Sequence, residues 1–299
     1  MYFVRLIMAL IVLLQLSHNA ASQVPTEASK EQELGAAFAD GLQASIHGKT
    51  DVRLESQAYL HLPPRYTFIP QPQAARIMRA LGNTVTASFV GLIFPEDETP
   101  DWFIAVNFIE SGYVKDGEAR EWKSDTLLTD LRAGTEEGNK DRIARGFEPI
   151  EIVGWAEPPA YDMYSHRLVW AATLRNKINP NSPFTVNYNT YALGREGYFT
   201  LNLMTQADRL QGNKVHSRIL LAALEYNAGK AYTDFNASTD NVAAYGITAL
   251  VAGVAAKKLG LFALLGVFFV KFAKLLVLAA VAVLVGLKRM FTGHKTPSS

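Results

Sequence analysis

The chain has 299 residues, with 29 Lys and Arg against 28 Asp and Glu, and no cysteine. Without cysteine there are no disulfides, no thiolate catalysis and no cysteine metal ligands. All 28 acidic residues lie within residues 23–240, where only 21 Lys and Arg oppose them and leave a net charge of −7. An acidic surface of this kind argues against nucleic acid as a partner.

The first 22 residues are predicted to be a secretory signal peptide. Arg5 precedes an apolar run over residues 6–14 that is too short to span a bilayer, and the small residues Ala20 and Ser22 follow. We expect cleavage after Ser22, with cleavage after Ala21 as the alternative. An uncleaved N-terminal anchor is a second interpretation of the same segment.

Residues 23–49 are expected to form a polar leader and a short amphipathic helix over residues 34–46. Two strands are predicted next, at residues 58–62 and 66–69, joined over a Pro-Pro-Arg connection. These elements begin an exported domain.

The middle of the chain continues with a helix that Pro72 opens and Gly82 ends. Runs rich in β-branched and aromatic residues predict strands at residues 84–94 and 102–109. Residues 112–115 are expected to extend the second of these strands towards an Asp-Gly turn.

A long helix is predicted over residues 124–145, with Gly134 and Gly138 packed closely against a sheet. Four strands are expected after it, at residues 150–155, 168–174, 185–193 and 197–204. The last two form a hairpin across a Gly-Arg-Glu-Gly turn. The final helix of this part covers residues 213–225, and apolar periodicity predicts four inward residues, Val215, Ile219, Ala222 and Ala223.

Strands outnumber helices and most connections are short. We therefore predict an α+β fold over residues 50–236, with an antiparallel sheet flanked by helices and followed by a C-terminal helical membrane anchor. The anchor is assigned to residues 237–290 and a basic tail to residues 291–299.

The anchor segment contains several apolar runs divided by lysines. Asp240 is expected to cap a helix that begins at Val242, and a single crossing over residues 268–287 leaves Lys288 and Arg289 on the cytoplasmic side. In the alternative, residues 242–264 cross first and a second crossing returns. Small residues share one face of the first helix and suggest a homo-oligomer contact, namely Gly246, Ala249, Gly253 and Ala256.

The densest group of polar and aromatic side chains lies at residues 154–166. Glu157, Asp162 and His166 form a hypothetical catalytic group that supplies an acid, a base and an orienting residue, and Asp162 with His166 also makes half a metal site. The competing interpretation, which we favour, is a Pro-rich turn whose aromatic rings pack on the sheet edge. We predict no cofactor and no metal site, and the acidic residues 96–101 favour a solvated loop over a Ca²⁺ site.

Several motifs recur in the order of an uncharacterised family of bacterial membrane-anchored proteins. They are Asp101-Trp102, Gly112-Tyr113-Val114, Ile152-Val153-Gly154-Trp155-Ala156-Glu157-Pro158-Pro159, Leu168-Val169-Trp170-Ala171, Tyr188-Asn189, Leu193-Gly194-Arg195-Glu196-Gly197, Tyr232-Thr233-Asp234-Phe235 and Ser238-Thr239-Asp240-Asn241-Val242-Ala243-Ala244-Tyr245-Gly246. The chain resembles this family, which is known as a domain of unknown function, over residues 50–290. The resemblance implies a signal peptide, an exported domain and a C-terminal anchor, and it implies no activity.

The sequence thus predicts a bacterial inner-membrane protein whose domain lies in the periplasm and whose C-terminus is cytoplasmic. Its expected partners are the lipid bilayer and an envelope protein, and its expected role is binding or scaffolding rather than catalysis. Two alternatives stay open. One is a hydrolase or metal-dependent enzyme that uses Glu157, Asp162 and His166. The other is a sensor of the membrane state whose tail lysines, Lys257, Lys258, Lys271 and Lys274, contact lipid headgroups.

Overall fold

The computed structural model describes residues 27–81, 83, 85–96, 101–144 and 148–252. The predicted signal peptide and the predicted crossing at residues 268–287 lie outside these ranges, as do Gly253, Ala256 and the tail lysines. Within the described ranges, no helix is both long enough and apolar enough to cross a membrane.

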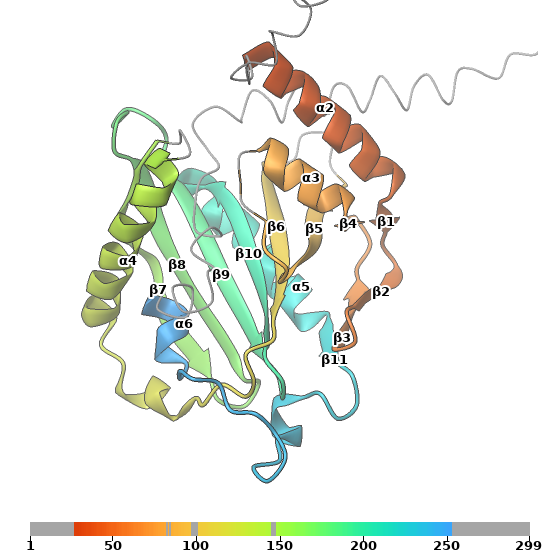
Figure 1. Ribbon diagram of the computed structural model, residues 1–299, viewed down its shortest axis with the longest axis vertical. Helices are drawn as coiled ribbons and strands as arrows, with labels where there is room; N and C mark the ends of the chain where they lie inside the picture. Colours follow the sequence, from red (N-terminus) through yellow and green to blue (C-terminus); the bar gives the residue numbers. More distant parts are fainter. Residues whose placement is uncertain (1–26, 82, 84, 97–100, 145–147, 253–299) are drawn as a thin grey trace, which may run out of the picture.

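An antiparallel sheet of eight strands forms the centre of the described fold (Figure 1). Its spatial order is β1-β4-β5-β6-β10-β9-β8-β7. The strands are β1 (Ile46–His47), β4 (Tyr66–Pro70), β5 (Phe89–Pro95), β6 (Trp102–Ile109), β7 (Ile150–Asp162), β8 (Arg167–Asn176), β9 (Thr185–Leu193) and β10 (Tyr198–Gln206). The predicted hairpin of β9 and β10 is confirmed, with Leu193 opposite Tyr198.

A second sheet, which the sequence reading did not foresee, lies over one face of the first. It contains three antiparallel strands in the order β11-β3-β2, with bounds Leu224–Tyr226 for β11, Ala58–Leu62 for β3 and Thr50–Leu54 for β2. Both strands predicted on either side of the Pro-Pro-Arg connection exist, but β3 belongs to the small sheet and β4 to the large one. The connection is therefore a crossover between two layers, and apolar residues of both sheets share one core.

Helix α5 (Leu210–Ala222) packs beside the small sheet on the same face. Its predicted inward side is wrong at Val215, Ile219 and Ala222, whereas Ala223 packs against the core. Val215 and Ile219 are 46% and 40% exposed. The inward stripe instead contains Leu210, Asn213, Ser217, Leu220 and Leu221. Two polar residues belong to this stripe, and Asn213 is accommodated by a 2.9 Å hydrogen bond to the Thr205 hydroxyl. Apolar periodicity alone therefore selected the outer face.

The opposite face of the large sheet is covered at two ends, as Figure 1 shows. Helices α2 (Glu27–Gln43) and α3 (Gln73–Ala80) cover strands β4 to β6. Helix α2 begins within the segment that we expected to be a leader, and Arg76 of α3 pairs with Glu33 and Asp40 along it. These ion pairs explain why a polar stretch continues as a helix.

Helix α4 (Ser124–Ala144) covers the other end of the same face and protects the outer edge of β7. The Asn139 amide donates to the Ile150 carbonyl at 2.8 Å and accepts from its N–H at 2.9 Å. Arg132 donates to the carbonyls of Ile152 and Val153. Both glycines are half-buried and Asn139 is buried, and the close contact predicted through Gly134 and Gly138 stays a prediction.

The predicted helix from Val242 onwards is wrong over its first turn. Val242 lies in an extended segment that pairs in parallel with Tyr113, and Ile247 donates its N–H to the Lys115 carbonyl. The extension predicted for β6 at residues 112–115 thus pairs with this segment, which we call the C-terminal strap (residues 236–252). The strap ends in the short helix α6 (Thr248–Ala252), and Ile247, Leu250 and Val251 are buried beside α4.

Asp240 does not cap a helix but forms two hydrogen bonds with the Arg195 guanidinium, at 2.7 and 2.8 Å. Gly246 precedes α6 and lies against the Glu118 carboxylate, and Ala249 packs against the core under α4. Both small residues therefore contact their own domain. The oligomer contact predicted through them and through Gly253 and Ala256 stays a prediction.

Candidate functional site

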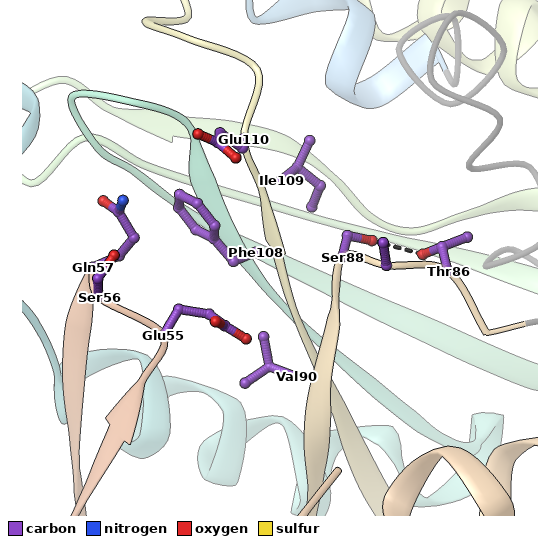
Figure 2. Close-up of a pocket in the computed structure, with 10 residues that line it drawn as sticks. Glu55, Ser56, Gln57, Thr86, Ser88, Val90, Phe108, Ile109 and Glu110 are labelled. Atoms are coloured by element: carbon purple, nitrogen blue, oxygen red, sulfur yellow. Dashed lines mark hydrogen bonds between the residues drawn. The ribbon is translucent and has the colours of Figure 1, made fainter. Parts of the chain in front are cut away.

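An open cavity of about 440 Å³ lies between the β2–β3 turn and the neighbouring ends of β5 and β6 (Figure 2). A second cavity of about 530 Å³ shares Glu55, Ser56 and Val90 with the first, so the two are neighbours. We call them together the β2–β3 groove. Its residues come from the turn, from the segment before β5, and from β4, β5 and β6.

One wall of the groove is the β2–β3 turn, which is held by hydrogen bonds from outside it. Glu55 has a φ of 52°, in the left-handed region that reverses the chain. Asn227 donates its side-chain amide to the Ser56 carbonyl and its backbone N–H to the Gln57 carbonyl, both at 2.9 Å. The turn is thus tied to the chain that follows β11, and its outline does not depend on a ligand.

Behind this wall Gln57 connects to an ion pair. Its amide donates to Glu196 at 2.8 Å, and Lys230 Nζ lies 2.6 Å from both oxygens of the same carboxylate. The hydrogen bond from Lys230, reinforced by that from Gln57, lowers the pKa of Glu196, so this carboxylate stays charged. The Gln57 nitrogen is thus engaged with Glu196. The oxygen of the same amide is buried and has no hydrogen-bond partner among the described residues.

The floor of the groove is shaped by a bulge between β5 and β6, where the register shifts between Phe89 and Gly91. A Cβ atom at Gly91 would lie 2.5 Å from the Phe68 ring and 2.7 Å from the Ile69 carbonyl oxygen, so only glycine fits there. The bulge leaves Val90 and Phe108 half-buried at the floor. Their apolar side chains face the same hollow as the turn (Figure 2).

The groove carries unbalanced negative charge. Glu55 and Glu110 line the first cavity, both are exposed, and neither carboxylate forms an ion pair with any residue in the described part of the chain. No Lys or Arg is among the described residues that line this cavity. Arg53 lines the second cavity, where its Nε donates to the Glu55 carbonyl at 3.0 Å.

The three sequence-predicted residues Glu157, Asp162 and His166 have different hydrogen-bond partners. Glu157 lies 3.3 Å from Lys214 Nζ and 3.4 Å from the Tyr188 hydroxyl, on the α5 side of the sheet. Asp162 accepts from the Tyr164 N–H at 2.9 Å and from the Ser165 hydroxyl at 2.6 Å, which lowers its pKa. Asp162 also interacts electrostatically with His166, whereas no described contact links Glu157 to either residue. The hypothesis of a catalytic group at these three residues stays a prediction.

The favoured alternative, a Pro-rich turn, is corrected. Strand β7 continues to Asp162, and the two prolines lie where its register against β8 shifts, between Glu157 and Ala160. The expected packing of aromatic residues is present, since the rings of Trp155 and Trp170 meet edge to face at 5.9 Å.

His166 belongs instead to a cluster with Asp116 and Tyr161. The Tyr161 hydroxyl donates to Asp116 at 2.7 Å and lies 3.2 Å from His166 Nδ1. Burial and this bond to Asp116 raise the pKa of Tyr161 far above its ordinary value. The His166 ring also lies 4.2 Å from that of Tyr232. The cluster connects His166 in the β7–β8 turn to Asp116 in the segment after β6. It also connects His166 to Tyr232, which precedes the strap, so it holds these three segments together.

Among the described residues, no three His, Asp or Glu side chains are grouped so that they could hold a metal ion. The acidic loop that we predicted to be solvated is described only at its ends, and Glu96 there lies 2.8 Å from His47 Nδ1. The β2–β3 groove is thus a candidate ligand site in the described part of the chain.

Comparison with known proteins gives a family but no activity. No curated protein sequence matches the chain. The solution structure of cyanobacterial PsbP (CyanoP) from Synechocystis sp. PCC 6803 is similar with a TM-score of 0.35 and 8% identity, over 61% of this chain and 91% of that chain. A point mutant of protein Mog1 is similar with a TM-score of 0.29 and 11% identity, over 55% and 82%. Neither likeness is close enough to support an argument about function.

The family described as "Protein of unknown function (DUF2167)" matches residues 46–282, which is most of the chain. The match includes every strand described above and extends into the apolar run beyond the strap. The chain is therefore a member of the DUF2167 family.

Proposed function

We propose that this protein is an exported, membrane-anchored binding module whose β2–β3 groove binds a protein partner in the bacterial envelope. The observation that carries the proposal is the groove itself. Each of its two cavities falls in the range of roughly 300–1,000 Å³ that is usual for ligand sites. A preformed wall with an apolar floor and a few polar groups is the usual composition of such sites.

The anchor and the export are supported by the sequence. Residues 241–299 contain no Asp or Glu, and the family match extends to residue 282 within this acid-free tail. A bilayer crossing near residues 268–287 with Lys288, Arg289 and Lys295 after it follows the excess of cations that cytoplasmic segments carry. The described domain then lies on the periplasmic side of the inner membrane.

The length of the tether between domain and membrane is bounded in this proposal. Ala252 is the last residue of α6 and the crossing begins at residue 268, so 15 residues lie between them. Fifteen extended residues span at most about 54 Å. Because the strap is fixed to the domain through Tyr113 and Lys115, the domain stays within this distance of the membrane surface. A partner of the groove is accordingly held there too, as in a scaffold.

Site-specific photocross-linking tests the proposal. A photoreactive amino acid at Ser56, which is exposed and lines both cavities, is expected to give a discrete adduct with an envelope protein in living cells. The same amino acid at Thr126, exposed on α4, is the matched control and is expected to give none. Equal adduct patterns at the two positions, or no adduct at Ser56, would contradict a binding role for the groove.

A further inference from the structure

We propose that the groove recognises an extended protein segment through one of its Lys or Arg side chains, whose cationic head lies between Glu55 and Glu110 and whose stem lies over Phe108. The inference rests on the proposed binding function and adds the chemistry of the partner. Four observations support it: the unpaired carboxylates of Glu55 and Glu110, the apolar floor, the Gln57 oxygen without a hydrogen bond, and the position of β2 at the edge of the small sheet.

The charge of the first cavity selects a cation. Glu55 and Glu110 lie at opposite ends of the cavity, with Phe108 between them (Figure 2). A carboxylate in a partly enclosed site attracts a cation more strongly than one on an open surface, because fewer water molecules screen it. The single cation of the groove, Arg53, lines only the second cavity. An anionic ligand group is thus repelled from the first cavity.

The floor selects a cation that carries an aliphatic stem. Phe108 and Val90 present half-buried apolar surface between the two carboxylates, which a hydrated metal ion would leave uncovered. Lys and Arg lay their methylene stems along apolar surface while the charged head stays in a polar place. A cation above the Phe108 ring also gains attraction from the ring face.

The wall has an unused acceptor. Gln57 lines the first cavity and is only 6% exposed, and its oxygen has no partner among the described residues. A buried acceptor without a hydrogen bond costs free energy. Because this oxygen is enclosed, an N–H of a bound segment reaches it only after the Gln57 side chain turns towards the cavity.

The open edge of the small sheet favours an extended segment over a small molecule. Strand β2 is at the edge of the described three-stranded sheet, and Arg53 near its end and Glu55 directly after it border the second cavity. An exposed strand edge offers a row of backbone donors and acceptors on which a peptide can pair. The second cavity continues past Phe68 and Pro70, so it offers room for the residues that flank the cationic one.

Fluorescence anisotropy with the detergent-solubilised full chain tests the inference. The probes are three labelled ten-residue peptides in which Thr alternates with Lys, Gln or Glu. We expect the Lys peptide to bind about tenfold or more tightly than the other two, and more weakly as salt rises. Glu55→Gln and Glu110→Gln should each remove most of this preference, while Glu121→Gln, at an exposed carboxylate away from the groove, should keep it.

The outcomes separate the two proposals. If the Gln or Glu peptide binds as tightly as the Lys peptide and Ser56→Trp abolishes that binding, the cationic partner is wrong and the binding groove stands. If butylamine displaces the Lys peptide completely at equal concentration, the ligand is a small cation and the extended segment is wrong. If no peptide binds and Ser56 gives no photoadduct, both proposals fail. Thermal unfolding of each variant, with an unchanged midpoint expected, shows that the substitutions act on binding and not on folding.

Discussion

Asn139 shows how single polar side chains fasten the layers of this fold. Its side chain is 3% exposed, and both ends of the amide bond to the backbone of Ile150 at the start of β7. Asn139→Ala leaves the part-buried N–H and carbonyl of Ile150 without these two hydrogen bonds. We expect it to lower the free energy of unfolding by about 1–3 kcal/mol, measured from urea unfolding of the solubilised chain. Thr126→Ala, at an exposed position of the same helix, is the control, and equal losses in both variants would contradict the role of Asn139.

Asp240 makes the attachment of the strap dependent on pH. The hydrogen bonds from Arg195 and from the Asn236 N–H hold the pKa of Asp240 far below its usual value. The folded state therefore binds the proton less readily than the unfolded chain does. The stabilisation is complete above the unfolded pKa of about 3.9 and is lost as pH falls below it.

Asp240→Asn should lower the thermal midpoint at pH 7, and the difference between variant and parent should shrink as the pH falls from about 4 towards 2. Differential scanning calorimetry across this range provides the measurement. A difference that stays constant with pH would show that Arg195 does not act on the charge of Asp240.

The residues of the groove could not be assigned from the sequence, because they come from segments far apart in the chain. Glu55 and Glu110 look like ordinary exposed acids when each is read in its own surroundings. Only the bulge at Gly91 and the tie from Asn227 bring their segments to one hollow. A local reading favoured residues 154–166 because polar and aromatic residues are concentrated there, and the sheet distributes those side chains to different surroundings.

At the scale of elements, substitutions in α5 test which face of this helix packs against the core. Leu220 is fully buried, whereas Ile219 is 40% exposed. Leu220→Ala is expected to cost about 2–5 kcal/mol through lost burial and a cavity. Ile219→Ala is expected to change stability by roughly 0.5 kcal/mol. Urea unfolding of the two variants checks this contrast, and the reverse order would restore the helix face that apolar periodicity predicted.

The strands of the large sheet were predictable because their patterns are strong. Strands β9 and β10 are rich in Tyr, Thr and Phe and flank a glycine-containing turn, and their hairpin has the expected register. Strand β2 also alternates, with Val52 and Leu54 buried and Arg53 exposed, and this signal was overlooked. The three residues of β11 are too few to give any periodicity. The second sheet was missed for these two reasons.

The strap shows that an apolar sequence alone does not distinguish a segment buried in a protein core from one buried in a bilayer. Residues 242–252 read as the start of a membrane helix because they are apolar and small. In the structure, Ile247 and Val251 fill a protein core instead, and pairing with Tyr113 keeps the chain extended before α6. Hydrophobicity measures the preference for leaving water, and a protein core satisfies it as well as a bilayer does.

At the scale of the whole molecule, charge and packing divide the chain into two parts. Residues 23–240 have a net charge of −7, and the acid-free tail follows. The strap belongs to the packed domain and leads directly into that tail. In the proposed membrane-anchored arrangement, the negative charge of the domain disfavours contact with anionic lipid and leaves the groove free for a cationic partner.

Cysteine accessibility tests the central claim, an exported module anchored by its tail, most directly. The chain has no cysteine, so each introduced thiol reports alone. We predict that Thr126→Cys is labelled in intact cells by a thiol reagent that does not cross the inner membrane. Ser299→Cys should be labelled only after that membrane is permeabilised. Labelling of Ser299→Cys in intact cells would contradict the single crossing, and protection of Thr126→Cys there would contradict export itself.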